Sequence, residues 1–436
     1  MVPSLCDFIS GSSWLEKLTV CPALLQEWTS VYIWGRGGYF SGVLNDYAIA
    51  GHWPGDFQET GLQQWAENLR RRLRAPAVSL GLVFMAPRFF PYAQQVLEIL
   101  RVHARIPLLV GCSSQSLIVG SFEVEQDAGL ALGLYWLPGA QLEAFHFTQA
   151  QVEASRPGYW GLQNGVPANQ TNGWLVFIDP FHLDSEAWLR TWNEAYAPLP
   201  VMGGLASGDF SEQLTQLYLN GDLFEEGGVA ISFGGQVKLL GMISQGCTPI
   251  GETWTLTKVE QNIIHEIGNR PAYDVLAETF NQLPPEEQQK ARGNLFIGLV
   301  VNEYRDEFQR GDFLVRNLIG VDPRSGCIAV WALPRLGQTV QFQRRSAAAA
   351  TEDLHQLLTR VRQQLAHATL YGGCLCCCNG RGQNLFGHRH HDAQMIQQQL
   401  GPMGLAGFFC NGEIGPVGPK NFLHGFTASL ALFVQK

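Results

Sequence analysis

The distribution of apolar residues predicts a strand-helix-strand-strand order that is used more than once. An amphipathic helix comes first, from Leu62 to Leu73, because apolar side chains recur at helical spacing and basic ones take the other face. Apolar runs and helical spacing then alternate in the segments Val78–Pro87, Ala93–Leu100, Pro107–Gly111 and Gly129–Trp136. This order predicts a sheet with a helix packed on it.

The same order returns further along the chain. Its second copy comprises Trp174–Pro180, Ala187–Ala195, Leu199–Gly204 and Gly227–Phe233. A third, looser copy comprises Thr369–Cys378, Asp392–Leu400, Gly404–Cys410 and Asn421–Phe433. We therefore expect an α/β fold, with α+β-like mixed sheets, made of two domains built from related strand-helix-strand-strand units with helices packed on the sheets.

The stretch between the second and third copies predicts further strands and helices. We expect one alternating strand from Trp254 to Ile267, a helix with Pro271 at its first position, and a surface connection from Leu283 to Lys290. Three apolar strands follow, and then a helix from Ala347. The predicted division is an N-terminal extension of unclear role at 1–60, a first domain at 61–258 and a second at 259–436.

Charge and composition narrow the classes of partner. The formal net charge is -9, and no large basic block interrupts the sequence, so we expect neither nucleic acid nor an anionic membrane surface as partner. No apolar run approaches the ~18–20 residues of a membrane span, and the first residues lack the pattern of a secretory signal. Ten cysteines with four clustered near Cys374 favour free thiols over a disulfide framework, which predicts a cytoplasmic protein.

The cysteine run from Cys374 to Cys378 can be interpreted as a metal site or as small buried thiols of a strand. As a metal site with the nearby histidines it would need its thiols on a tight turn. The segment has the pattern of a strand, however, and side chains three positions apart on a strand face opposite ways. We therefore expect small buried thiols, with no metal and no other cofactor.

Cys378 and Cys410 are the thiols best placed for reactivity. Each lies where a strand gives way to a glycine-rich turn, whose backbone amides can lower a thiol's pKa. With His424 and Glu413 they could form a nucleophile, a base and an orienting group. The alternative to a binding protein is therefore a cysteine-dependent enzyme acting on a small molecule.

Two charged residues near the same strand ends suggest ligand recognition instead. Arg381 stands between Gly380 and Gly382, so its guanidinium could hold a carboxylate, or could pair with Asp392 or Glu413. Glu413 follows Asn411 and Gly412 and could bind an ammonium or a hydroxyl group of a ligand, or could be a solvated acid on a tight turn.

Strand ends in the first domain carry small polar groups. Cys112, Ser113 and Ser114 follow one strand, and Ser207 and Asp209 follow the equivalent strand of the second copy. Hydroxyls and backbone amides at such ends suit a small polar ligand, although they are also ordinary turn residues. The glycine spacing of a dinucleotide-binding loop is missing.

The motifs at these strand ends resemble those of the FIST family, named for F-box and intracellular signal transduction. The FIST N region is suggested by Gly111–Ser114, Val201–Asp209 and Ser244–Gly251, and the FIST C region by Cys378–Gly382, Gly407–Gly415 and Leu423–Thr427. No fused F-box or kinase pattern accompanies them. The resemblance implies a sensory domain that binds a small molecule such as an amino acid.

We accordingly expect a cytoplasmic small-ligand sensor that signals through a separate protein partner. The predicted ligand-binding residues are Asn379, Gly380, Arg381, Gly382, Cys410, Asn411, Glu413, His424, Thr427, Cys112, Ser113, Ser114, Ser207 and Asp209.

Overall fold

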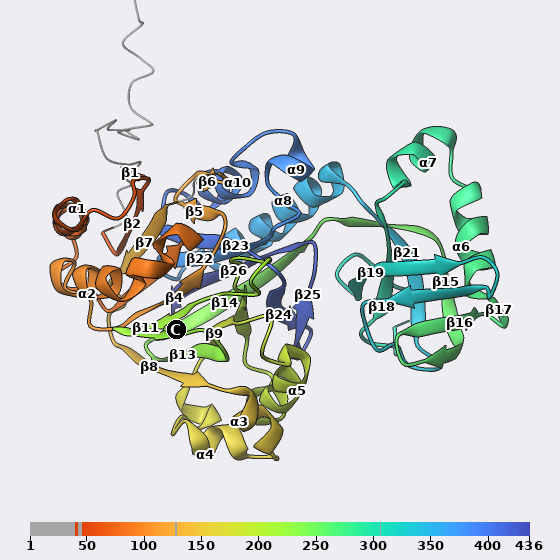
Figure 1. The fold of residues 1–436 in the computed structure, drawn as a ribbon, viewed down its shortest axis with the longest axis horizontal. Helices are drawn as coiled ribbons and strands as arrows, with labels where there is room; N and C mark the ends of the chain where they lie inside the picture. The colour runs from red at the N-terminus through yellow and green to blue at the C-terminus, as the bar shows by residue number, and fades with distance from the viewer. Residues whose placement is uncertain (1–39, 42–45, 127–128, 306) are drawn as a thin grey trace, which may run out of the picture. The chain divides into compact units, whose positions relative to one another are not determined.

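The computed structural model describes residues 40–41, 46–126, 129–305 and 307–436. The expected extension at 1–60 lies outside the described residues except for 40–41 and 46–60. The described chain forms four β-sheets with helices against them (Figure 1). The predicted fold class, α/β with α+β-like mixed sheets, is confirmed.

Three of the four sheets are each built mainly from one repeat, in which strands and helices follow one another in the same order along the chain. Repeat 1 comprises β2 (Ala48–Trp53), α1 (Glu59–Arg72), β3 (Leu80–Met85), α2 (Ala93–His103), β4 (Leu109–Ser113), β5 (Leu117–Val119), β6 (Phe122–Val124) and β7 (Leu130–Tyr135). The short strand β1 (Phe40–Ser41) pairs with β2. Repeat 2 comprises β8 (Ala140–Phe147), α3 (Gln149–Ala154), α4 (Tyr159–Gln163), β9 (Trp174–Ile178), α5 (Ser185–Tyr196), β10 (Val201–Leu205), β11 (Leu217–Leu219), β12 (Asp222–Phe224) and β13 (Gly228–Gly235).

Repeat 3 has the same order with one insertion. It comprises β14 (Val237–Gln245), α8 (Ala347–Gln364), β22 (Leu370–Cys378), α9 (Gln383–Phe386), α10 (His391–Leu400), β23 (Leu405–Cys410), β24 (Glu413–Val417), β25 (Lys420–His424) and β26 (Thr427–Gln435). The insertion lies between β14 and α8. The looser third copy expected from the sequence is therefore a full repeat.

The repeats are joined by an exchange of hairpins. In each sheet two parallel strands, such as β22 and β23, lie beside one antiparallel strand of the same repeat. The next position is filled from another repeat: β5–β6 joins β23, β11–β12 joins β4, and β24–β25 joins β10. No sheet of the three is therefore complete with its own repeat alone.

The three sheets share one apolar core. Phe84 of repeat 1, Phe177 of repeat 2 and Phe408 of repeat 3 meet there, with ring centroids 4.9 Å apart for Phe84 and Phe408 and 5.6 Å apart for Phe177 and Phe408. The helices cover the outer faces, as α8 and α10 do for the sheet of β22, β23 and β26. Apolar burial thus holds the repeats together at their centre.

The insertion in repeat 3 forms an antiparallel barrel. Its strands β15, β21, β18, β19, β20 and β16 pair in that order, and β16 pairs back with β15. β15 bends at Gly251, where φ is +64° and the register shifts, which lets one strand pair with two others along its length. The insertion comprises β15 (Cys247–Glu260), β16 (Ile263–Ile267), β17 (Arg270–Pro271), α6 (Ala272–Asn281), α7 (Pro285–Ala291), β18 (Leu295–Val300), β19 (Phe313–Asp322), β20 (Cys327–Val330) and β21 (Thr339–Arg345).

Several local predictions differ from the structure. The single strand expected from Trp254 to Ile267 is two strands, because the chain turns at Gln261, where φ is +51°. The expected surface connection at 283–290 contains α7, since a proline fits the first turn of a helix. The strand expected from Asn421 to Phe433 is likewise two strands, β25 and β26.

The expected domain division stays a prediction, and its boundary between 258 and 259 falls inside β15. Among the described residues, every helix is too short or too polar to cross a bilayer.

Candidate functional site

The ends of β4, β10 and β23 bring predicted site residues from all three repeats together. The hydroxyl oxygens of Ser114 and Ser207 lie 2.9 and 2.7 Å from the carbonyl oxygen of Phe409 and 3.2 Å from each other. The side-chain amide of Asn411 donates to the carbonyl of Ala206 (3.0 Å). These bonds connect the repeats at the point where their parallel strands end.

Other predicted residues lie beside or away from this cluster. Asn379 donates its side-chain amide to Asn411 Oδ1 (2.7 Å), and Ser113 Oγ accepts the backbone N–H of Gln216 (3.0 Å). Cys112 is buried in the shared core, and the carboxylate of Asp209 accepts the backbone N–H of Ser211 in its own turn.

Glu413 is fully buried at the start of β24, three residues after Cys410, the last residue of β23. Its Oε2 accepts the N–H (3.0 Å) and the hydroxyl (2.7 Å) of Thr427, and its Oε1 lies 3.2 Å from the thiol of Cys410. Burial raises the pKa of Glu413 to about 7, although the bonds from Thr427 lower it. Three predicted residues, Cys410, Glu413 and Thr427, thus form one buried hydrogen-bonded group, in which Glu413 has a pKa near neutral.

A pH dependence of stability follows from Glu413. Its carboxyl has a pKa of about 7 when folded against an ordinary value of 4.5, so between these pH values the folded state binds more protons than the unfolded state. The stability that this group contributes is present below pH 4.5 and is lost as pH rises to about 7. Glu413→Gln, which stays neutral, is expected to reduce the fall in unfolding free energy between pH 5 and pH 8 by about 1–3 kcal/mol. Urea denaturation at several pH values measures it.

The matched control is Glu98→Gln, which removes an exposed carboxylate on α2. It is expected to leave the pH profile unchanged. A Glu413→Gln profile parallel to that of the wild type would contradict the assignment of a near-neutral pKa to Glu413.

Arg381 follows β22 and is 1% exposed. Its Nε and Nη2 donate to the two carboxylate oxygens of Asp392 at 2.7 and 2.8 Å, and His391 Nδ1 lies 3.0 Å from the same carboxylate. Burial raises the pKa of Asp392, but the pair with Arg381 lowers it overall. Of the two partners considered from the sequence, Arg381 hydrogen-bonds Asp392.

The third guanidinium nitrogen of Arg381 does not take part in the pair with Asp392. This nitrogen, Nη1, is buried and has no hydrogen-bond partner among the described residues. A side chain at Gly246 would place its Cβ 3.4 Å from this nitrogen. Nη1 of Arg381 therefore lies next to Gly246, which belongs to the motif Ser244–Gly251 at the start of the barrel. Buried polar groups are usually paired. Among the described residues, Nε of Arg101, of Arg310 and of Arg344 is also buried without a partner.

Two further arginines adjoin this position. Arg345 donates to the carbonyl of Gly380 (3.2 Å), and its guanidinium lies 5.5 Å from the ring centroid of Phe426. Burial raises the pKa of the Cys247 thiol to about 12, while Arg345, Arg381 and Arg310 oppose the rise. The charges of three arginines therefore act on the thiol of Cys247.

The sequence analysis did not predict three residues near this position: Arg345, Arg310 and Phe426. Arg345 directly follows Arg344 on a strand, and nothing in the local sequence indicates which of these two arginines lies at the site. Gly380 and Gly382 shape the turn that carries Arg381. Gly382 has a φ of +63°, and a Cβ there would lie 2.7 Å from a carboxylate oxygen of Glu125.

The thiols do not have the surroundings of a nucleophile. Burial and then Glu413 raise the pKa of Cys378 to about 12, and the same causes raise the pKa of Cys410 well above its usual range. His424 bonds the carbonyl of Gly415 (3.1 Å), and burial lowers its pKa to about 4. Within the described ranges, His424 makes no hydrogen bond to either thiol.

The prediction that strand alternation divides the cysteine run is confirmed. Cys374 and Cys376 lie in the core shared by the sheets, and Cys377 faces α8 and α10. Across the residues that the structure describes, no group of three or more histidine, cysteine or acidic side chains could hold a metal ion.

Comparison with known families matches the chain over most of its length. A FIST N domain matches residues 79–270, and a FIST C domain matches residues 272–416. The chain belongs to the FIST family. FIST domains are associated with signal transduction and small-ligand sensing.

Relatives of this FIST protein occur in mycobacteria. It is 35% identical over 373 residues to an uncharacterized protein of Mycobacterium tuberculosis, covering 85% of this chain and 95% of the relative. An uncharacterized protein of Mycobacterium bovis is equally similar, with 94% of its length covered. In this FIST protein the unpaired nitrogen of Arg381, from the FIST C region, adjoins Gly246, from the FIST N region.

Proposed function

We propose that this FIST protein is a cytoplasmic sensor of an amino acid or a similar small metabolite and that it signals through a separate protein partner. The observation that carries the proposal is the buried Nη1 of Arg381, which has no acceptor among the described residues. A ligand carboxylate supplies that acceptor. Asp392 already holds the other two nitrogens, so the guanidinium is fixed in one orientation.

Arg345 supports an anionic group at this position. It lies next to the turn that carries Arg381, and its side chain is only partly buried. Together the two guanidinium groups favour a carboxylate over a neutral acceptor, since a hydrogen bond to a charged group contributes roughly twice as much as a neutral one.

Two carboxyl groups near Arg381 support a cationic group on the same ligand. Asp353 accepts the backbone N–H of Gln245 (2.7 Å), and burial raises its pKa while Arg310 and Arg381 lower it. Glu413 likewise responds to the charge of Arg381. These two acids are the reason to propose an amino acid rather than a simple anion.

The test is calorimetric titration with the common amino acids and with small carboxylic metabolites. We expect at least one ligand whose uncharged amide analogue fails to bind. Arg345→Gln is expected to weaken that ligand about 10- to 100-fold, because a hydrogen bond to a charged group contributes about 1.5–3 kcal/mol.

The matched control is Arg344→Gln on the same strand. Arg344 pairs with Glu287 of the barrel, so its replacement is expected to leave affinity unchanged. Equal weakening by both variants, or equal binding of the amide analogue, would refute a carboxylate held by this cluster.

A further inference from the structure

β14 is an edge strand of its sheet. It pairs along its whole length with β26, from Val237 opposite Gln435 to Gln245 opposite Thr427. No other described strand pairs with it. An edge strand presents alternate backbone N–H and C=O groups outward, and these groups can pair with another extended chain. At the two ends of β14 such groups are already bonded, since Asn172 donates to the carbonyl of Val237 (2.8 Å) and the N–H of Gln245 donates to Asp353 (2.7 Å). The middle of the strand is the part that a further chain could pair with.

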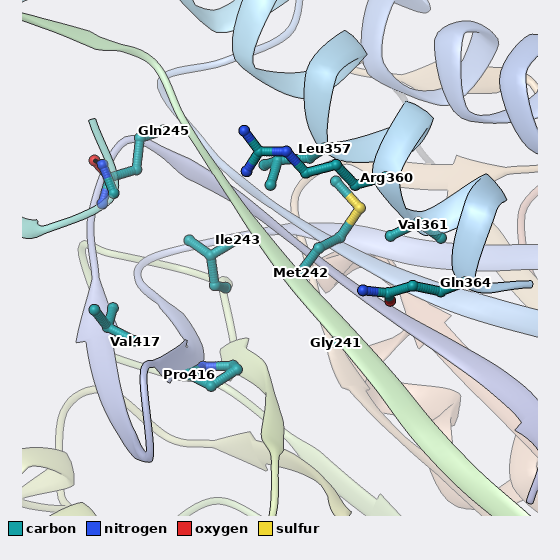
Figure 2. Close-up of a pocket in the computed structure, with 11 residues that line it drawn as sticks. Gly241, Met242, Ile243, Gln245, Leu357, Arg360, Val361, Gln364, Pro416 and Val417 are labelled. Atoms are coloured by element: carbon teal, nitrogen blue, oxygen red, sulfur yellow. Dashed lines mark hydrogen bonds between the residues drawn. The ribbon is translucent and has the colours of Figure 1, made fainter. Parts of the chain in front are cut away.

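A pocket follows this edge (Figure 2). Gly241 and Ile243 belong to the face of β14 that meets repeat 2 and β24, since a Cβ at Gly241 would lie 2.2 Å from the sulfur of Met202. Met242 belongs to the opposite face, packed against α8 with Val361. The pocket of about 250 Å³ is lined by residues of both faces, so it lies along the strand's edge rather than on either face.

The equivalent edge in repeat 1 already accepts a strand. β2 has the place in its sheet that β14 has in its own, and β1 pairs with it, Phe40 opposite Gly51 and Ser41 opposite Ala50. The architecture of a repeat therefore permits one more strand at this position.

The walls of the pocket limit what can enter. Leu357, Arg360 and Val361 of α8 form one side, and Pro416 and Val417 of the β24–β25 hairpin form the other. A second copy of this chain would bring its own α8 and hairpin on both sides of its β14, so the two edges could pair only if each entered between the walls of the other. A single extended segment has no such walls of its own, which makes it the occupant we propose.

The charge at the rim indicates the chemistry of that segment. Arg360 is exposed and makes no hydrogen bond or ion pair with any described residue. Its side chain extends along the pocket in Figure 2. An acidic side chain on the entering segment would pair with it.

We propose that an extended segment of a partner protein, with small or β-branched residues and one acidic side chain, adds to the β14 edge between α8 and the β24–β25 hairpin. Main-chain hydrogen bonds hold the segment, and Arg360 selects its acidic residue. The inference rests on the proposed function only for the expectation of a protein partner.

Hydrogen–deuterium exchange of the full chain tests the edge directly. The probe is a blocked peptide of alternating threonine and valine with one central glutamate, added without any small ligand. Outward-facing amides of β14, apart from that of Gln245, which already donates to Asp353, are expected to exchange rapidly alone and at least about tenfold more slowly with the probe. A peptide N-methylated at alternate residues is expected to give no protection.

Exchange of β14 unchanged by the probe, or equal protection by the methylated peptide, would overturn the proposal. Protection that depends on protein concentration without probe would make a second copy the occupant, which also overturns it. Because this measurement involves no small ligand, its failure leaves the carboxylate site standing, and failure of the calorimetry leaves this edge standing.

Arg360→Glu tests the charge. It is expected to weaken the glutamate probe about tenfold and to make a lysine-containing version of the peptide the better ligand. Arg362→Glu is the matched control, since Arg362 is exposed on the same helix but does not line the pocket. The same change of preference in both variants would refute the role of Arg360.

Discussion

Asp392→Ala is expected to lower the free energy of unfolding by about 3–5 kcal/mol. Asp392 and Arg381 are both 1% exposed, and the carboxylate is the acceptor of two guanidinium nitrogens and of His391. Removing it leaves a buried cation with no counter-charge, which costs far more than the net stability of an intact pair. Urea denaturation followed by circular dichroism measures the change.

Asp274→Ala is the matched control. Asp274 also lies in the first turn of a helix, α6, but is exposed. Its loss is expected to cost at most about 1 kcal/mol through the helix dipole. If Asp392→Ala cost no more than Asp274→Ala, the buried pair would not be the main support of this turn. The double variant Arg381→Met, Asp392→Leu is expected to recover much of the loss, because it removes both members of the buried ion pair.

Phe408→Ala is expected to destabilise the protein by a similar amount, about 3–5 kcal/mol. Its ring lies in the core shared by the three repeats, against Phe84 and Phe177. Truncation leaves a cavity bordered by elements that the hairpin exchange holds in place, so the surroundings can relax only in part.

Phe210→Ala provides the comparison, since Phe210 is 54% exposed. A change within about 0.5 kcal/mol is expected there. Denaturant titration of both variants gives the difference. A loss below about 1 kcal/mol for Phe408→Ala would mean that the repeats do not depend on one common core.

The buried faces of single helices and strands could be predicted from the sequence, because they depend on the spacing of residues that are close along the chain. Val96, Leu97 and Leu100 mark the buried face of α2, and the alternation of Cys374, Cys376 and Cys377 placed them on two faces of β22. Both patterns follow from the periods of helix and strand.

The assembly of repeats could not be predicted in the same way. The segment Leu117–Val124 has the same apolar pattern whichever sheet it joins, so nothing local assigns it to β23. The burial of Glu123 next to Asp392 could not be predicted either, because it depends on where this hairpin packs. The site shares this limit. Arg381 and Glu413 were predicted as site residues, whereas Arg345, at the end of the last barrel strand, reaches the turn that carries Arg381 only through the fold.

The exchange of hairpins has a consequence for synthesis on the ribosome. The sheet of repeat 2 lacks β24–β25 until the last part of repeat 3 has emerged, and the β5–β6 hairpin made in repeat 1 has no strand to join until β23 exists. The nascent chain therefore exposes unpaired edges throughout translation, and its contact order is high. Chaperone protection of the nascent chain is expected to matter more for this architecture than for repeats that each complete their own sheet.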